Sequence, residues 1–354
     1  MKLPRITILA TLLLTAPAAA QLQITPPATT PSPPAEKQKA KPPAPAKKKE
    51  AAPAPKPSAS PKPALPATVI PAPPTDNSNV DLVYGAYQRG QYKTAFELAT
   101  ARAQAGDPKA MTMLGELYSN AMGIRRDYAK ALEWYKRAAD AGDREAMFAL
   151  AMLRISGRGG PVDKGEAVKL MASAAKLGEP KAAYNLALLY LDGQTLPQDV
   201  KRSAELLRQA ADAGLPEAQY ALATFYKEGT GVPKDPERAV RLLQAASLTD
   251  NVDAEVEYAI ALFNGTGTPK NQPAAVALLR KASRRGSAIA QNRLAWVLIN
   301  GMGTSVDKVE GFKWHLVAKT AGKGDPELDK QLSDLPAEDR AKAEAAARKW
   351  LGTK

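Results

Sequence analysis

Residues that could carry catalysis or bind a metal are scarce in this sequence. It contains one histidine, His315, and no cysteine, so it cannot supply the histidine and cysteine clusters that hold zinc, haem iron or a reactive thiol. Two Ser-x-x-Lys tetrads begin at Ser173 and Ser305 and have the spacing of an acylating serine and its lysine. The Ser-Asp-Asn and Lys-Thr-Gly elements that accompany that motif are absent. We therefore predict no catalytic residue, no cofactor and no metal site, and we expect that the protein is not an enzyme.

A row of carboxylates, with one amide, recurs at intervals of 36 residues. Its members are Asp127, Asp163, Asp199, Asp235, Asn271 and Asp307. Successive members are separated by a whole structural unit, so they would lie too far apart to share a metal ion. Each precedes a helical pattern, and a short polar side chain at that place accepts hydrogen bonds from the first free backbone amides of a helix. We predict that these residues are N-caps.

The interval reflects a repeated unit of 36 residues. The first unit, residues 110–145, is followed by five more without insertion or deletion. The units begin at Ala110, Ala146, Ala182, Ala218, Ala254 and Ala290. Copies at a fixed period of this length are typical of stacked repeat proteins, in which each unit packs on its neighbours.

Each unit has the pattern of two helices, here called helix A and helix B. Counted from the leading alanine as position 0, helix A carries apolar residues at positions 4 and 8 and a small residue at position 5, which lie along one side of a helix. Glycines at positions 11 and 13 predict its C-terminal end. Helix B alternates small residues with large ones, and at its large positions we interpret Trp134, Tyr135 and His315 as packing residues.

The composite pattern A-x-x-x-L-G-x-x-Y, G-x-G, D-x-x-K-A-x-x-W-Y-x-K-A-A-x-x-G resembles the Sel1-like repeat, a relative of the tetratricopeptide repeat. The resemblance covers residues 110–324 and is weaker in the second and fifth units, where Arg154 and Tyr258 replace the usual residues. It implies an all-α, right-handed α-solenoid of antiparallel helix pairs, with helix A on the concave side, that serves as a protein–protein interaction scaffold. Exported members have been discussed as β-lactam binders, so acylation at Ser173 or Ser305, or cell-wall hydrolysis, is an alternative.

Positions 2 and 6 of helix A point away from helix B of the same unit. Apolar and aromatic side chains there predict a partner-binding stripe that consists of Phe148, Met152, Tyr184, Leu188, Tyr220 and Trp296. Such a stripe has two interpretations, because it could pack against a neighbouring helix A or anchor a bound protein segment. The sequence leaves both open.

The segments that flank the repeats have the character of caps. Residues 77–109 keep the helix B pattern after a degenerate helix A, and residues 325–354 predict two helices, at 326–332 and 336–350. A stack of repeats needs such terminal units to shield its ends.

The first 76 residues differ in kind from the rest. Residues 1–20 combine two basic residues, a short apolar run and a final run of three alanines, which is the pattern of a secretory signal peptide with cleavage after Ala20. Its apolar run is much shorter than the roughly 20 residues of a membrane span. Residues 21–76 hold 17 of the 30 prolines, eight lysines against three acidic residues, and no aromatic residue. This composition predicts a disordered linker.

These patterns predict an exported protein of the periplasm or cell envelope whose partner is another protein or peptide. The alternative is association with peptidoglycan or another anionic envelope polymer through the cationic linker. Residues 77–354 hold 39 basic and 33 acidic residues, a mild excess, and nucleic acid is not an expected partner. We expect no transmembrane span in the mature chain.

Overall fold

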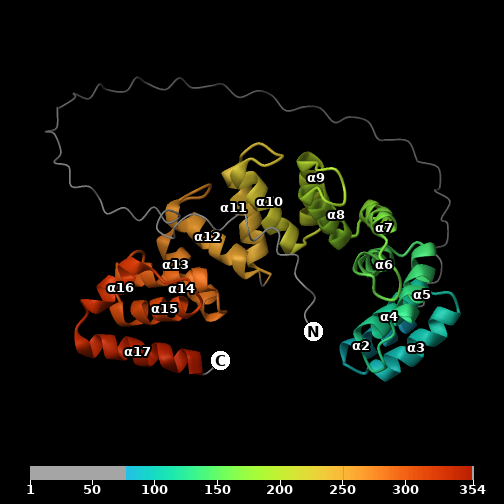
Figure 1. Ribbon diagram of the computed structural model, residues 1–354, viewed down its shortest axis with the longest axis horizontal. Coiled ribbons are helices and arrows are strands. Elements are labelled where there is room, and N and C mark those ends of the chain that lie inside the picture. Colours follow the sequence, from blue (N-terminus) through green and yellow to red (C-terminus); the bar gives the residue numbers. More distant parts are fainter. Residues whose placement is uncertain (1–76, 250, 353–354) are drawn as a thin grey trace, which may run out of the picture. The chain divides into compact units, whose positions relative to one another are not determined.

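The computed structural model describes residues 77–249 and 251–352, and within them it contains 16 α-helices and no strand (Figure 1). The predicted signal peptide and linker, residues 1–76, lie outside the described residues. The helices in chain order are α2 (Asn77–Gln88), α3 (Tyr92–Gln104), α4 (Pro108–Asn120), α5 (Tyr128–Asp140), α6 (Arg144–Ser156), α7 (Lys164–Lys176), α8 (Pro180–Asp192), α9 (Val200–Asp212), α10 (Pro216–Glu228), α11 (Pro236–Ser247), α12 (Val252–Asn264), α13 (Gln272–Arg284), α14 (Ala288–Ile299), α15 (Lys308–Thr320), α16 (Pro326–Ser333) and α17 (Ala337–Gly352).

Each repeat is a pair of helices that packs on the next pair. Helix A of the six units corresponds to the even-numbered helices α4 to α14, and helix B to the odd-numbered helices α5 to α15. Every helix B packs against helix A of its own unit, and the first five also pack against helix A of the following unit. One helix pair cannot bury both of its apolar faces alone, so each pair stacks on its neighbours in chain order. This stacking confirms the predicted all-α solenoid.

The recurring carboxylates cap helix B, as predicted. In all six units the side-chain Oδ1 accepts a hydrogen bond from the backbone amide three residues later, over 2.8–3.1 Å. Helix A has similar caps in the first two units, where Asp107 accepts from Lys109 N at 2.9 Å and Asp143 from Ala146 N at 2.8 Å. The 36-residue row is therefore explained by helix starts, at about 1 kcal/mol for each cap.

Size matching fills the space between helix A and helix B. The alanine at position 0 is buried in every unit, and so is the leucine at position 4 wherever it occurs. In the first unit, Gly115 stands where the other units have alanine, and a methyl group added to it would lie 2.5 Å from the ring of Tyr135. A larger residue on helix B is thus matched by a smaller one on helix A.

The end of helix A requires a left-handed residue in the first five units. Gly157, Gly193, Gly229 and Gly265 supply it with φ between 64° and 81°. In the first unit this place is taken by Ala121, with φ 59° and ψ 38°. Among the described residues it is the one non-glycine with positive φ, and this conformation is unfavourable for a residue with a Cβ atom.

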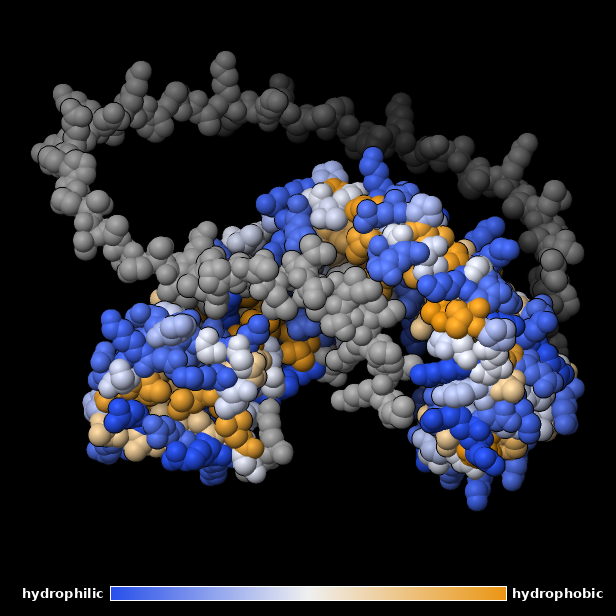
Figure 2. Space-filling model, in the orientation of Figure 1, coloured by the Kyte–Doolittle hydropathy of each residue, from blue (hydrophilic) through white to orange (hydrophobic). Residues whose placement is uncertain are grey.

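Helices α16 and α17 close the C-terminal end of the array, and both were predicted. Helix α17 packs against α15, where Trp314 and Trp350 meet edge to face with their ring centroids 5.0 Å apart. Figure 2 shows apolar surface over this part of the molecule, and between α15 and α17 there is a shallow cleft of about 290 Å³ lined by Leu316, Ala347 and Leu351. No described helix is long and apolar enough to cross a membrane.

Candidate interaction surface

The predicted stripe residues lie on four different helices A. Phe148 and Met152 belong to α6, Tyr184 and Leu188 to α8, Tyr220 to α10 and Trp296 to α14. The first five are half-buried, so each keeps part of its surface accessible, whereas Trp296 is buried with 9% of its surface exposed. The six residues therefore do not form one uniform surface.

Side chains at position 2 of helix A reach the beginning of the next helix A. Thr112 Oγ1 hydrogen-bonds Asp143 Oδ1 at 3.1 Å, and Asn292 Nδ2 donates to the carbonyl of Lys323 at 3.1 Å. Both partners stand at position 33 of their own unit, just before the next helix pair begins. Position 2 thus lies at the junction between consecutive helices A, which accounts for the buried half of these side chains.

The two tyrosines at position 2 occupy the same kind of junction. Burial, reinforced by the carboxylate of Glu217, raises the pKa of Tyr184. Burial also raises the pKa of Tyr220 well above its ordinary value, and the carboxylates of Glu257 and Asp253 on α12 add to the effect. Both phenols are therefore neutral at physiological pH and can donate a hydrogen bond beside an acidic rim.

Leu188 differs from its neighbours in the stripe. Phe148, Met152, Tyr184 and Tyr220 pack partly against buried apolar clusters of the array. Leu188 is half-exposed and belongs to none of the clusters identified among the described residues. Among the half-buried stripe residues, Leu188 therefore contributes least to the packing of the array.

Trp296 is fixed within the C-terminal end of the array. Its indole Nε1 donates to Asp325 Oδ2 at 3.0 Å, while the other oxygen of Asp325 caps α16 by accepting from Glu327 N at 2.9 Å. The ring is therefore held against the turn that begins α16. Burial and this hydrogen bond leave Trp296 little surface to offer a partner, so it differs from the accessible anchor expected from its position.

His315 is a packing residue with a structural hydrogen bond. It has no exposed surface, and its Nε2 lies 2.9 Å from Asp329 Oδ1, an atom that also accepts from Lys319 Nζ at 2.7 Å. The hydrogen bonds from Lys319 and then His315 lower the pKa of Asp329. This cluster ties α15 to α16.

The two candidate serines lie in unrelated surroundings. Ser173 is exposed on helix α7, and Ser305 is exposed in the loop that precedes α15. In the part of the chain that the structure describes, neither hydroxyl makes a hydrogen bond.

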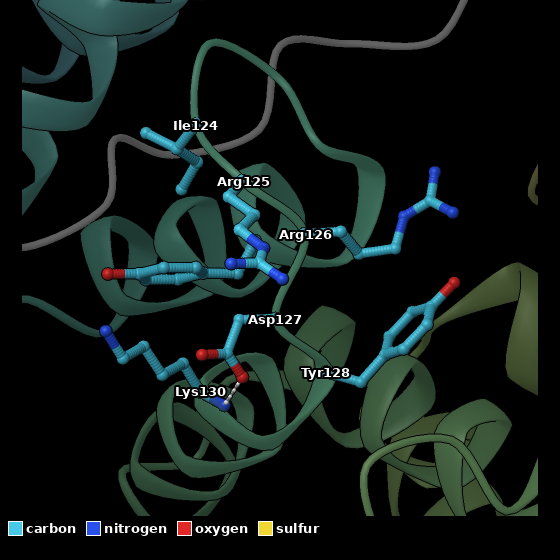
Figure 3. Close-up of a pocket in the computed structure, with 7 residues that line it drawn as sticks. Ile124, Arg125, Arg126, Asp127, Tyr128 and Lys130 are labelled. Carbon is cyan, nitrogen blue, oxygen red and sulfur yellow. Dashed lines mark hydrogen bonds between the residues drawn. The ribbon is translucent and has the colours of Figure 1, made fainter.

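A cationic cleft within the first repeat was not predicted from the sequence. We define it by Tyr118, Ile124, Arg125, Arg126, Asp127, Tyr128 and Lys130, which line about 540 Å³ at the loop between α4 and α5 (Figure 3). The arginines and the lysine are exposed, and the tyrosines are half-buried. Arg125 could have indicated this cleft from the sequence alone, because four of the other units carry proline at the equivalent position.

Comparison with known protein families gives six matches to the model described as Sel1 repeat. They cover residues 108–143, 144–179, 180–215, 216–248, 252–287 and 288–323. These limits begin two residues before the units counted above, because they include the first turn of helix A. A comparison with curated proteins gives no significant match.

Solved structures with the same repeat are similar to this chain. One is a protective antigen present in uropathogenic Escherichia coli strains, with an SLR fold, a TM-score of 0.67 and 25% identity over 77% of this chain. The chain spans 60% of the length of that protein. A Sel1 repeat protein from Oxalobacter formigenes has a TM-score of 0.57 and 24% identity, with 68% of this chain and 96% of that chain covered.

Proposed function

We propose, starting from the fact that the chain belongs to the Sel1 repeat family, that this protein is an adaptor that holds a segment of a partner protein along the helix A face. Sel1 repeat proteins are generally protein-interaction scaffolds, and their fold is typically non-enzymatic. The observation that carries the proposal is the half-exposed apolar stripe of Phe148, Met152, Tyr184, Leu188 and Tyr220 on three consecutive helices A.

The stripe suits an extended or helical segment with several apolar side chains. Aromatic and aliphatic anchors that are already half-buried lose little side-chain entropy when a partner covers them. The neutral hydroxyls of Tyr184 and Tyr220 lie near carboxylates, which add polar contacts at the edge of the apolar surface. A partner segment with apolar anchors and flanking polar or basic groups fits this combination.

A photocrosslinking experiment in cells tests the proposal. A benzophenone amino acid at Leu188 on α8 is compared with the same probe at Lys169, which is exposed on helix B of the preceding unit. We expect a discrete protein adduct from position 188 and none from position 169. Equal adducts from both positions would refute binding at the helix A face.

Matched variants can be taken from the protein's own repeats. Met152→Glu and Tyr220→Thr place on the stripe the residues that the first unit carries as Glu116 and Thr112 at the same positions, so the fold should tolerate them. In the variant that carries both changes, the adduct from position 188 should fall by about tenfold, which corresponds to the loss of about 1.4 kcal/mol of binding free energy. The control is an unchanged helical CD spectrum and melting temperature within a few degrees.

We also infer that the protein acts after export to the periplasm or cell envelope. The support is the pattern of residues 1–20, followed by a segment rich in proline, alanine and lysine that suits a spacer. N-terminal sequencing of protein from the envelope fraction should begin at Gln21. Recovery of the chain in the cytoplasm with Met1 retained would contradict this inference.

A further inference from the structure

We propose that the cationic cleft between α4 and α5 binds an acidic segment of a partner protein, one with several carboxylates in close succession. This inference rests on the proposed scaffold function and names the chemistry of one partner segment. The surface differs from the apolar stripe, because it is formed by a loop of the first unit and not by a helix A face. The two surfaces can therefore be tested separately.

Among the described residues, the cations of the cleft have no carboxylate in a salt bridge with them. Asp127 is the one acidic residue that lines it, and its Oδ1 accepts from the backbone amide of Lys130 at 3.0 Å. Arg125, Arg126 and Lys130 form no salt bridge with any described residue. Elsewhere in the array several exposed cations are paired, as in the ion pairs that join Arg202 to Glu205 and Lys227 to Glu257, both at 2.7 Å.

Aromatic rings lie beside two of these cations, Arg126 and Lys130, without neutralising their charge. Lys130 Nζ lies 5.4 Å from the centre of the Tyr118 ring. The guanidinium carbons of Arg126 and Arg158 lie 5.8 Å and 5.5 Å from the centre of the Tyr128 ring. A guanidinium placed over a ring keeps its N–H groups available for a carboxylate, and restricting its motion in advance lowers the entropy lost on binding.

The fold does not require arginine in this loop. The position of Arg125 is occupied by Pro161, Pro197, Pro233, Pro269 and Ser305 in the other units. All six loops nevertheless end with the same backbone hydrogen bond, from the N-cap amide to the carbonyl nine residues earlier, over 2.8–3.1 Å. Because the loop closes in the same way with proline, Arg125 is not explained by local structure.

The arrangement favours an acidic peptide over a single phosphate or a lipid surface. Figure 3 shows the side chains of Arg125 and Arg126 directed to different sides of the loop, and the side chain of Lys130, on α5, directed away from both. Separated cations match several carboxylates on one segment better than they match one compact anion. Residues 21–76 have a net charge of +5, eight lysines against three acidic residues, so the chain's own linker has the wrong charge to occupy the cleft.

Binding of labelled peptides to the full-length protein tests the proposal. The probes are a fluorescein-labelled octaglutamate peptide and the matching octaglutamine peptide, measured by fluorescence anisotropy. The variant Arg125→Pro/Arg126→Gln reproduces the Pro197-Gln198 sequence of the third unit. The control variant, Lys169→Gln/Lys176→Gln, removes the same charge from exposed positions of α7.

We expect the octaglutamate peptide to bind and the octaglutamine peptide not to bind, with affinity that falls as salt is added. The loop variant should weaken binding by about tenfold, since two charge-assisted contacts are lost, while the control variant should change it by less than about twofold. If both variants lose the same affinity for the octaglutamate peptide, the overall positive charge of the protein explains binding, and the cleft is not the binding site. Competition by inorganic phosphate at equal concentration, or equally Arg125-dependent binding to vesicles that contain phosphatidylglycerol, would overturn the choice of an acidic peptide.

The same variants separate this inference from the proposed function. If the cleft is wrong but the scaffold function is right, the Leu188 crosslink persists in cells and the octaglutamate peptide does not distinguish the loop variant from the control. If the helix A face is wrong, the Leu188 crosslink is absent whatever the peptide measurements give.

Discussion

Exchanging Gly115 for alanine should have opposite effects on stability in two backgrounds that differ only at residue 135. A Cβ atom at Gly115 would lie 2.5, 2.6 and 2.8 Å from three carbons of the Tyr135 ring, and Tyr135 is only 5% exposed. The ring therefore has little room to move away. Overpacking of this kind typically costs 1–3 kcal/mol, against which alanine gains up to about 1 kcal/mol over glycine in helix propensity. The net expectation for Gly115→Ala is a loss of about 1 kcal/mol.

The second background is Tyr135→Leu, which reproduces a pairing found elsewhere in the chain. The third, fourth and fifth units combine alanine at position 5 with leucine at position 25, for example Ala187 with Leu207, and both of these residues are fully buried. With leucine at position 135 the clash is gone and only the propensity gain remains. Gly115→Ala should then stabilise the protein by about 0.5–1 kcal/mol, which gives a coupling energy of about 2 kcal/mol between the two positions.

The measurement is urea unfolding of the four proteins of this double-mutant cycle, followed by CD at 222 nm. Amide hydrogen exchange in α4 and α5 is measured alongside, because a repeat array can unfold in parts and a single global free energy can then mislead. If Gly115→Ala changes stability by the same amount in both backgrounds, within about 0.5 kcal/mol, size matching between these helices does not explain the glycine.

Three further substitutions test the caps and the charges. Ala121→Gly should stabilise the array by about 0.5–1 kcal/mol because residue 121 has φ 59°, whereas Ala141→Gly, at φ −84°, should destabilise it in the same thermal melt. Asp199→Ala removes the acceptor that bonds Arg202 N at 2.9 Å, and should cost about 1 kcal/mol in urea, a loss that Asp199→Ser largely avoids. The pKa of Asp329 is lowered from 3.8 by Lys319 and His315, so its ionised form stabilises the fold above that pH and the benefit is lost as pH falls below it. The melting temperatures of wild type and Asp329→Asn should therefore differ at pH 6 and converge as the pH falls from 3.8 through the lowered pKa of Asp329; a constant difference would contradict this.

The periodic features of the fold could be predicted because each depends on a few neighbouring residues. The helix pairs follow from the spacing of apolar side chains, and the caps from residues such as Asp127 that precede them. The burial of Trp296 could not be predicted in this way. It depends on a hydrogen bond to Asp325, a residue from the segment beyond the repeats, and the pattern within the repeat contains no information about that turn.

The stripe was only partly predictable for a similar reason. Sequence spacing shows that positions 2 and 6 face away from helix B, but it does not specify the rotation between consecutive units. That rotation decides how much of Tyr184 or Tyr220 the next helix A covers, and in the structure both side chains are only partly buried. The same side chains therefore pack within the array and keep some accessible surface, which is the surface that the proposed partner would cover.

The first unit differs from the other units at Gly115 and at Arg125. A neighbouring side chain compensates for the first difference but not for the second. Gly115 replaces alanine, and the larger Tyr135 fills the space that results, so packing explains both changes together. Arg125 stands where the other units have proline or serine, yet it forms no salt bridge with a described residue, and the loop closes with the same backbone hydrogen bond as in every other unit. An exposed charge that the fold neither needs nor neutralises is available to a ligand, and this contrast between Gly115 and Arg125 is the reason to look for an acidic partner at the first loop.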